Sequence, residues 1–327
     1  MGDILLRHEW STHGVSPSTA RDSSRLSPGD KIGVEGPTRK LVAAPTSYVP
    51  AGLPRVSVVI NTLNEEATIA GCVRSVGGLA DEIVVADMHS TDRTVEIARG
   101  LGARVVPVEA RYGDFGRLRY LAVMQAHYDW VLVIDADERM TPELALRLRE
   151  IVLENRVDVV LFGNLYWYFG GWVRHGGFFA NTWPRFFRRS TFLARYRDAE
   201  EAIHNDLSVL RGVENHLVLP KRYYVEHYAY PTIEKYVSKT LGVYARLEAE
   251  QHFRSGRRFS VARLVGAPLV EFVRRYVLWL GYRDGLRGFI LAILFAAYRF
   301  TTWANLWFLE RGDRPRQDTP HLPEVRG

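Results

Sequence analysis

Two aspartates stand one residue apart where an apolar run ends in the middle of the chain. The segment 130–139 reads WVLVIDADER, so Asp135 and Asp137 directly follow a β-branched run. Such a run is typical of a strand buried on both faces. If the extended geometry continues through the pair, both carboxylates point the same way. They would then suit a divalent cation that already carries phosphates, and the alternative is a strand that ends in a solvated acidic turn.

Other polar groups follow neighbouring apolar runs. Residues 55–60 and 81–86 have the composition of strands, and the residues that come next are Thr62, Asn64 and Glu65 in the first case and Asp87 in the second. Ligands of open α/β sheets bind at the carboxyl ends of the strands. Polar groups at several adjacent strand ends therefore favour a binding site over an acidic turn.

Strand-like and helix-like segments alternate around these motifs. Further strands are expected at 103–108 and 131–134, and the helices between strands at 67–76, 95–101 and 115–127. Another helix should begin at Pro142, with Thr141 as its cap. This alternation predicts a doubly wound, mostly parallel α/β sheet with right-handed crossovers.

No glycine-rich phosphate loop follows the first strand-like run. Neither G-x-G-x-x-G nor G-x-x-x-x-G-K-[ST] occurs there, which argues against dinucleotide-binding and P-loop proteins. A nucleoside diphosphate bound without a backbone cradle needs a metal ion. The aspartate pair would supply the site for it.

Composition sets broad limits. The chain has 327 residues, is 47% hydrophobic and 24% charged, and is long enough to bury a large core. Its formal charge of +6 allows an acidic ligand or an anionic membrane surface. A single cysteine, Cys72, excludes an internal disulfide framework. Residues 1–53 predict a flexible N-terminal extension without a signal peptide, and 311–327 a polar tail.

The segments 56–66, 81–92 and 129–138 together resemble family 2 glycosyltransferases. More narrowly, they are similar to the branch that contains lipopolysaccharide-core β-glucosyltransferases. The likeness covers residues 54–250, of which 54–150 would form the nucleotide-sugar half and 151–250 the acceptor half. It implies a GT-A fold, a nucleotide-diphosphate sugar donor with a UDP-sugar favoured, Mg²⁺ or Mn²⁺ as cofactor, and inversion at the anomeric carbon.

The resemblance also implies roles for individual residues. Thr62 and Glu65 would hold the nucleoside, Asp87 would read the base edge, and Asp135 would bind the ribose. Asp137 would bind the metal, and His227 follows a predicted strand at a position from which the family's histidine can approach metal or diphosphate. Arg119 matches an arginine near the donor phosphates, although Tyr120 replaces the usual asparagine after it. The donor-binding set is then Thr62, Asn64, Glu65, Asp87, Asp92, Arg119 and Asp135.

A second acidic cluster lies at residues 200–206, which read EEAIHND. Inverting transfer needs a carboxylate that takes the proton of the acceptor hydroxyl. The resembling family carries His followed by Glu here, whereas this chain has Asn205 after His204. The general base therefore stays open among Glu200, Glu201 and Asp206, any one of which could instead be a surface carboxylate.

Aromatic residues gather after position 160. Trp172 and Trp183 lie beside glycine-rich and basic segments, and aromatic rings stack on the apolar faces of sugars. We expect these two rings to contact the acceptor, with core packing as the alternative.

Residues 251–310 combine short apolar runs with Trp, Tyr and Arg. This pattern predicts amphipathic helices that lie on an anionic membrane surface, with a helical subdomain or dimer interface as the alternative. No uninterrupted apolar run reaches 18 residues, so a simple spanning helix is not indicated.

The sequence thus predicts an inverting, metal-dependent glycosyltransferase on the cytoplasmic face of the membrane. It would act on a lipid-linked or glycan acceptor, with no nucleic acid partner. One alternative is a sugar nucleotidyltransferase, which would want a basic glycine-rich loop where this chain has the acidic Asn64-Glu65-Glu66. The other is a non-catalytic membrane-bound scaffold, which Asn205 favours.

Overall fold

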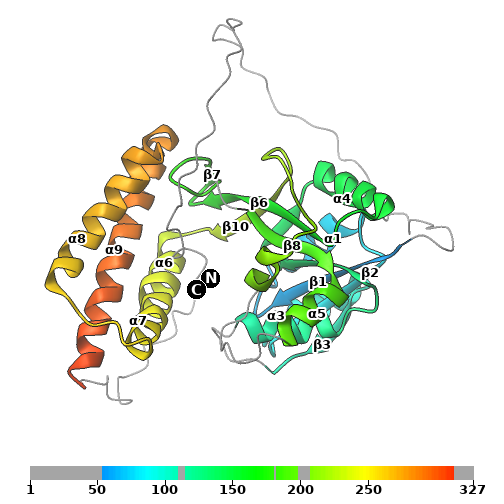
Figure 1. Ribbon diagram of the computed structural model, residues 1–327, viewed down its shortest axis with the longest axis horizontal. Helices are drawn as coiled ribbons and strands as arrows, with labels where there is room; N and C mark the ends of the chain where they lie inside the picture. Colours follow the sequence, from blue (N-terminus) through cyan, green and yellow to red (C-terminus); the bar gives the residue numbers. More distant parts are fainter. Residues whose placement is uncertain (1–53, 110–114, 180–181, 198–206, 313–327) are drawn as a thin grey trace, which may run out of the picture.

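The computed structural model describes residues 54–109, 115–179, 182–197 and 207–312. Figure 1 shows a twisted sheet with α1 (Ile69–Val76) and α4 (Pro142–Glu154) on one face and α3 (Phe115–Met124) and α5 (Arg189–Arg197) on the other. The helices α6 to α9 gather to one side of the sheet. The α/β class and the helical C-terminal region expected from the sequence are confirmed.

Parallel strands form one half of the sheet. The central strand β1 (Val56–Thr62) pairs in parallel with β2 (Glu82–Asp87) and β4 (Trp130–Asp135), and β2 pairs with β3 (Arg104–Pro107). All of β1 is buried, as a continuously apolar strand requires. The register places Asn61 beside Asp135 and Thr62 beside Asp87, so the polar strand ends do meet at one edge.

The other half of the sheet is mixed. Beyond β4 come β8 (Thr182–Arg188), β6 (Val159–Tyr168), β10 (Tyr224–Tyr230) and β5 (Glu138–Met140) in that order, with β7 (Gly171–Val173) and β9 (His216–Val218) also pairing with β6. Strand β8 is antiparallel to β4 and β6, β10 is parallel to β6, and β5 is antiparallel to β10.

This order forces the sheet to curl. Strand β5 begins three residues after β4 ends, which spans at most about 11 Å. In a flat sheet β4 and β5 would stand four strand spacings apart, about 19 Å. The far edge of the sheet must therefore come back towards the end of β4. The curl brings His227 opposite Glu138, beside the aspartate pair.

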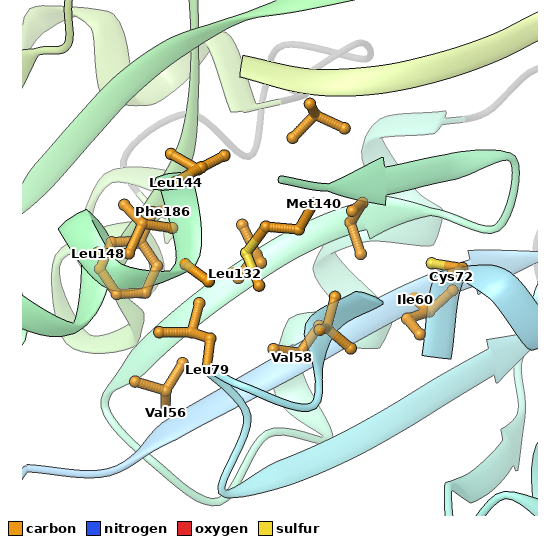
Figure 2. Packing of buried hydrophobic residues seen from close by; sticks show 14 of the residues in the cluster. Val56, Val58, Ile60, Cys72, Leu79, Leu132, Met140, Leu144, Leu148 and Phe186 are labelled. Atoms are coloured by element: carbon orange, nitrogen blue, oxygen red, sulfur yellow. The ribbon is translucent and has the colours of Figure 1, made fainter. Parts of the chain in front are cut away.

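Each face of the sheet carries its own apolar core. Figure 2 shows the core under α1 and α4, where Ile60, Leu132 and Phe186 pack with Leu144 and Leu148. The opposite core packs strand residues against α3 and α5. Helix α4 begins as expected, because the Thr141 hydroxyl accepts a hydrogen bond from the Leu144 amide at 3.4 Å. The short helix α2 (Thr94–Gly100) completes the parallel half.

The C-terminal helices pack against one another and against the sheet. Helices α6 (Ile233–Tyr236) and α7 (Ala245–Arg254) are joined by a π-helical segment, Val237–Tyr244. Helix α9 packs against both α7 and α8 (Val261–Val273). A π-helical turn, Arg274–Leu278, and a 3₁₀ turn, Gly281–Asp284, connect α8 to α9. Phe295 of α9 joins the aromatic cluster at the ends of β6 and β10.

Helix α9 (Gly285–Glu310) is longer than its apolar run indicates. Arg299 ends the run in the sequence, but its guanidinium lies 3.2 Å from Glu248 and 3.5 Å from Glu271, so its charge is paired inside the helical layer. Among the described residues, Gly281–Glu310 is long and apolar enough to cross a membrane. This is weak evidence, because the core helix of a soluble protein passes the same test, and one face of α9 is buried.

Candidate functional site

A cleft opens at the carboxyl ends of β1 and β4. Six of the predicted site residues line it, namely Thr62, Glu65, Arg119, Asp135, Asp137 and His227. The ends of β1 and β4 supply Thr62 and Asp135, and the turn after β4 supplies Asp137. His227 comes from the middle of β10, Glu65 from the β1–α1 loop and Arg119 from α3. This is the crevice that the strand-end pattern predicts.

Asp137 and His227 meet across the curl of the sheet. The Asp137 carboxylate lies 3.3 Å from His227 Nε2, and the backbone amide of Tyr228 donates to the Asp137 carbonyl at 2.9 Å. The distance allows an electrostatic contact, yet Nε2 makes no well-aligned hydrogen bond to any described residue. Burial alone would raise the pKa of Asp137, but the charge and contact of His227 together with the charges of Lys239 and Lys235 lower it to about 2. Burial alone would lower the pKa of His227, but the carboxylates of Asp137, Glu138 and Asp135 together raise it.

A buried ionic network orients the His227 ring through its Nδ1 atom. Glu138, which is fully buried, accepts hydrogen bonds from Arg185 at 2.6 Å and from Asn164 at 2.9 Å. Its other contacts are the Asp135 amide at 2.9 Å and His227 Nδ1 at 3.3 Å. Burial raises the pKa of Glu138, although Arg185 pulls it down. With Nδ1 held towards Glu138, the ring presents Nε2 to Asp137.

Asp137 and His227 together could provide two ligands of a metal site. The carboxylate oxygen of Asp137 is a competent ligand for Mg²⁺ or Mn²⁺, and the His227 nitrogen, which has no hydrogen-bond partner among the described residues, suits Mn²⁺ better than Mg²⁺. Within the described ranges no group of three or more His, Cys, Asp or Glu side chains forms a complete site. The arrangement suits a cation that keeps several positions for substrate phosphates, as Mg²⁺ does.

Polar atoms without partners line the neighbouring strand ends. The Thr62 hydroxyl and both amide atoms of Asn61 are buried and have no hydrogen-bond partner in the described chain. A buried polar group left unpaired costs about 1–3 kcal/mol, so such groups indicate a bound ligand or water. The sequence reasoning missed Asn61. Its position one residue before Thr62, on the strand end that meets Asp135, was the available signal.

Arg119 and Glu65 add charge to the cleft. Arg119 is buried and lies 3.8 Å from the Asp135 carboxylate. Glu65 accepts a hydrogen bond from the Thr68 hydroxyl at 2.8 Å. Burial raises the pKa of Glu65, and the negative charge of Asp137 raises it further.

Three of the predicted donor-binding residues hold loops together. Asn64 has a φ of 53° and accepts from the Thr91 amide at 2.8 Å. Asp92 accepts from the Glu66 amide at 3.1 Å, and Asp87 accepts from the Ser90 amide at 3.1 Å. The contacts of Asn64 and Asp92 tie the loop after β1 to the loop after β2, whereas the contact of Asp87 lies within the loop after β2. None of the three side chains is among those that line the cleft.

The predicted acceptor residues are not among the side chains that line the cleft. Trp172 packs edge-on against Tyr228 with ring centroids 5.4 Å apart. Trp183 lies under the Arg211 guanidinium at 4.4 Å. Glu200, Glu201 and Asp206 fall outside the described residues.

The helix after β10 contributes two cleft residues that the sequence reasoning did not select. Lys239 and Tyr244 line the cleft opposite the strand ends. Both belong to the π-helical segment, which α-helical periodicity does not reveal.

Comparisons with known proteins agree on one family. The model described as "Glycosyl transferase family 2" matches residues 57–213. An uncharacterized glycosyltransferase of Rickettsia typhi is 30% identical over 263 residues, which are 78% of this chain and 87% of the relative. The lipopolysaccharide core biosynthesis glycosyltransferase LpsC of Rhizobium meliloti is 29% identical over 269 residues, 77% of this chain and 92% of LpsC. Staphylococcus aureus TarS 1–349, solved with UDP-GlcNAc, shares 19% identity over 79% of this chain and 92% of its own, with a TM-score of 0.44.

Proposed function

The chain belongs to glycosyl transferase family 2, and from that membership we propose that it moves a sugar, with inversion, from a nucleotide-diphosphate donor to a lipid-linked or glycan acceptor. The observation that carries the proposal is the pairing of Asp137 with His227 in a cleft that also holds Asp135 and Arg119. A UDP-sugar is the favoured donor.

The residues of the cleft divide the work between nucleoside and phosphates. Asp135 binds the ribose, and the unpartnered groups of Thr62 and Asn61 face the nucleoside. Asp137 and His227 hold Mg²⁺ or Mn²⁺, which when bound neutralises the charge of the leaving diphosphate. Arg119 adds a fixed positive charge beside the phosphates.

The remaining donor-binding predictions act through the loops. Asp87 reads the base edge at the end of β2. Asn64 and Asp92 shape the nucleoside side of the cleft, because their hydrogen bonds join the two loops that border it. Glu65 closes this side beside Asp137.

A carboxylate from residues 200–206 acts as the general base. It is Glu200, Glu201 or Asp206, and it takes the proton from the acceptor hydroxyl as that oxygen attacks the anomeric carbon. Amide substitution of each residue in turn identifies it: one variant should lose transfer by a factor of about 10² or more while donor binding is kept. Glu214→Gln is the matched control, since Glu214 is exposed on a described loop.

A cell-envelope acceptor is supported by the relative LpsC, whose name places it in lipopolysaccharide core biosynthesis. Trp172 is the ring we assign to acceptor contact, because it packs on Tyr228, the residue that follows His227. We assign a similar role to Trp183 on β8, which pairs with β6 as β7 does.

The surface of α8 and α9 suits a membrane. Large apolar side chains project from both helices and the turn between them, among them Leu269 at 63%, Leu278 at 69% and Leu286 at 73% exposure. Between residues 255 and 312 every exposed charged side chain is an arginine, namely Arg257, Arg258, Arg263, Arg283 and Arg311.

The acidic residues of the same region are all engaged. Glu271 pairs with Arg275 at 2.6 Å, Asp284 accepts from the His175 amide at 2.8 Å, and Glu310 accepts from the Phe259 amide at 2.7 Å. An apolar face bordered only by cations suits the anionic headgroups of the cytoplasmic leaflet.

Nucleotide titration tests the catalytic proposal. Calorimetry with UDP-, GDP- and ADP-sugars, with and without Mn²⁺, should find one base that binds more tightly with the metal. Asp137→Asn should remove the metal dependence and the release of nucleoside diphosphate while the thermal midpoint stays intact. Retained activity would refute the metal assignment. Release of pyrophosphate would instead favour a nucleotidyltransferase, and absence of all binding would favour a scaffold.

Vesicle co-sedimentation tests the membrane proposal. Deleting α9 would also open the core, because Leu291 and Phe295 pack inside, so single substitutions are better. Leu269→Gln and Leu286→Gln should weaken binding to vesicles that contain phosphatidylglycerol. The control is Leu146→Gln on α4, where the leucine is equally exposed at 68%. Equal vesicle binding by all three variants would show that the surface of α8 and α9 does not bind the membrane.

A further inference from the structure

A π-helical segment interrupts the helix that follows β10. Residues Val237–Tyr244 form it between α6 and α7, and the amide of Ala245 bonds to the carbonyl of Thr240, five residues earlier. Isolated π-helical turns inside α-helices often occur at functional sites. Here the segment faces the donor cleft.

The π turn explains why two of its side chains reach the same cleft. Lys239 and Tyr244 are five residues apart, and both line it. In an α-helix, side chains five residues apart diverge by about 140°, because each residue turns by about 100°. A helix that bonds residue i to i+5 has more residues in each turn, so side chains five residues apart diverge less than they do in an α-helix. The irregular backbone therefore aligns a cation and a phenol ring towards the strand ends.

The cleft needs cations if it is to admit a diphosphate. Three carboxylates line it, those of Glu65, Asp135 and Asp137. Of the described residues in the lining, Arg119 and Lys239 carry permanent positive charge, and Arg119 already faces Asp135. One further cation beside the metal pair would balance the polyanion.

Lys239 is close enough to interact electrostatically with Asp137 and Glu65. The positive charges of Lys239 and Lys235 act on the Asp137 carboxylate. The same two lysines lower the pKa of Glu65 against the effects of burial and Asp137. Lys239 therefore lies within electrostatic reach of both sides of the cleft.

We propose that Lys239, placed by the π-helical segment, binds the diphosphate of the donor and of the leaving nucleotide. This inference rests on the proposed transferase function and deepens it. Lysine is a common phosphate binder that acts as a point charge. When the sugar departs, the diphosphate gains negative charge, so a cation at this place stabilises the transition state more than the bound donor.

The alternative is a lysine that only covers the helix face with its aliphatic stem. Lys239→Met keeps the stem and removes the charge, and Lys239→Arg keeps the charge. Lys221→Met is the matched control, because Lys221 is exposed on the loop before β10 and outside the cleft.

Titration of UDP and uridine into the full-length chain with Mn²⁺ separates these roles. Lys239→Met should weaken UDP by about 10- to 100-fold, the usual range for one charge-assisted hydrogen bond, and change uridine binding by less than about 3-fold. Lys239→Arg should recover most of the UDP affinity. Lys221→Met should match the unsubstituted chain. In turnover, kcat should fall more than KM changes for Lys239→Met.

Two different results would contradict the inference. Equal loss of UDP and uridine binding, or no loss of either, would show that Lys239 does not contact the diphosphate, although the transferase proposal would stand. Absence of UDP, GDP and ADP binding by the unsubstituted chain would overturn the proposed function and this inference with it. A second readout, the salt dependence of UDP binding, should become shallower in Lys239→Met.

Discussion

The buried pair Glu138–Arg185 should be necessary both for stability and for the proposed metal site. Its charged groups lie 2.6 Å apart, with 0% of the Glu138 side chain and 9% of the Arg185 side chain exposed. Arg185→Met leaves the Glu138 carboxylate without its cation in the interior. Removing one partner of a buried pair costs about 3–5 kcal/mol. We expect a lowering of the thermal midpoint by about 6–20 °C on the scale of 2–4 °C for each kcal/mol.

A double-mutant cycle distinguishes a buried pair from a surface one. Glu138→Gln should cost as much as Arg185→Met. The NH₂ group of the glutamine must face hydrogen-bond donors, either the Asp135 amide and Arg185 on one side or the Asn164 amide group on the other. The double variant should be no worse than either single variant, since no unpaired charge remains. The contrast is Arg147→Met, whose pair with Glu150 is exposed at 25% and 61% and should be worth less than about 1 kcal/mol.

The assays are urea unfolding at pH 7 and metal-dependent nucleotide binding. Because Glu138 orients His227, Arg185→Met at permissive temperature should also weaken Mn²⁺-dependent binding by about 10- to 100-fold. A cost below about 1 kcal/mol for Arg185→Met would refute the reasoning, because it would mean that water reaches the pair. A large cost with unchanged metal dependence would refute only the link to His227.

Two further predictions concern the scaffold. Burial alone would raise the pKa of Glu82, but hydrogen bonds from Arg104, the His127 amide and Ser57 together lower it below its ordinary value of 4.5. The ionised Glu82 side chain therefore stabilises the fold above pH 4.5, and this stabilisation is lost as the pH falls through the folded-state pKa. Glu82→Gln should therefore cost about 1.5–3 kcal/mol at pH 7 by urea unfolding, and a gap that stays constant from pH 7 to pH 3 would contradict this. A Cβ on Gly288 would overlap the Gly281 carbonyl, so Gly288→Ala should lower the thermal midpoint. Gly266→Ala, in open space on α8, should raise stability by about 0.5–1 kcal/mol, and equal midpoints for the two variants would exclude the close approach.

The parallel half of the fold could be predicted because its signals are local. Strands β1, β2 and β4 are continuous apolar runs, and their polar ends lie next to each other once the sheet is parallel. Asp135 and Asp137 were recognisable for this reason. The relative orientation of the two carboxylates was not predictable. Asp137 lies in a turn rather than continuing the strand, so Asp135 faces Arg119 whereas Asp137 faces His227.

Partners from distant strands could not be predicted in the same way. Asn164 and Arg185 stand between apolar residues of β6 and β8. The sequence does not show that both donate to Glu138, because that contact depends on the pairing of β5 with β10. Asn64 and Asp92 illustrate the opposite case. Both stand where ligand-binding residues are expected, yet their polar atoms are used by neighbouring backbone amides, as short polar side chains in loops often are.

The helical region shows how tertiary pairing overrides local pattern. Arg299 interrupts an apolar run in the sequence, but its contacts with Glu248 and Glu271 allow α9 to continue through it. The alignment of Lys239 with Tyr244 is likewise invisible to α-helical periodicity, because it depends on a backbone irregularity.

The curl of the sheet also determines when the protein can become active during its synthesis. Asp137 leaves the ribosome 90 residues before His227, and β10, which carries His227, is the strand that pairs with β5. Contacts between distant segments form late in folding, and N-terminal parts fold first on the ribosome. We therefore expect a nascent chain that ends near residue 213, where the family match stops, to hold the nucleoside-facing strand ends without a cation site. Such an intermediate would be unable to break down nucleotide sugars before the acceptor side is complete.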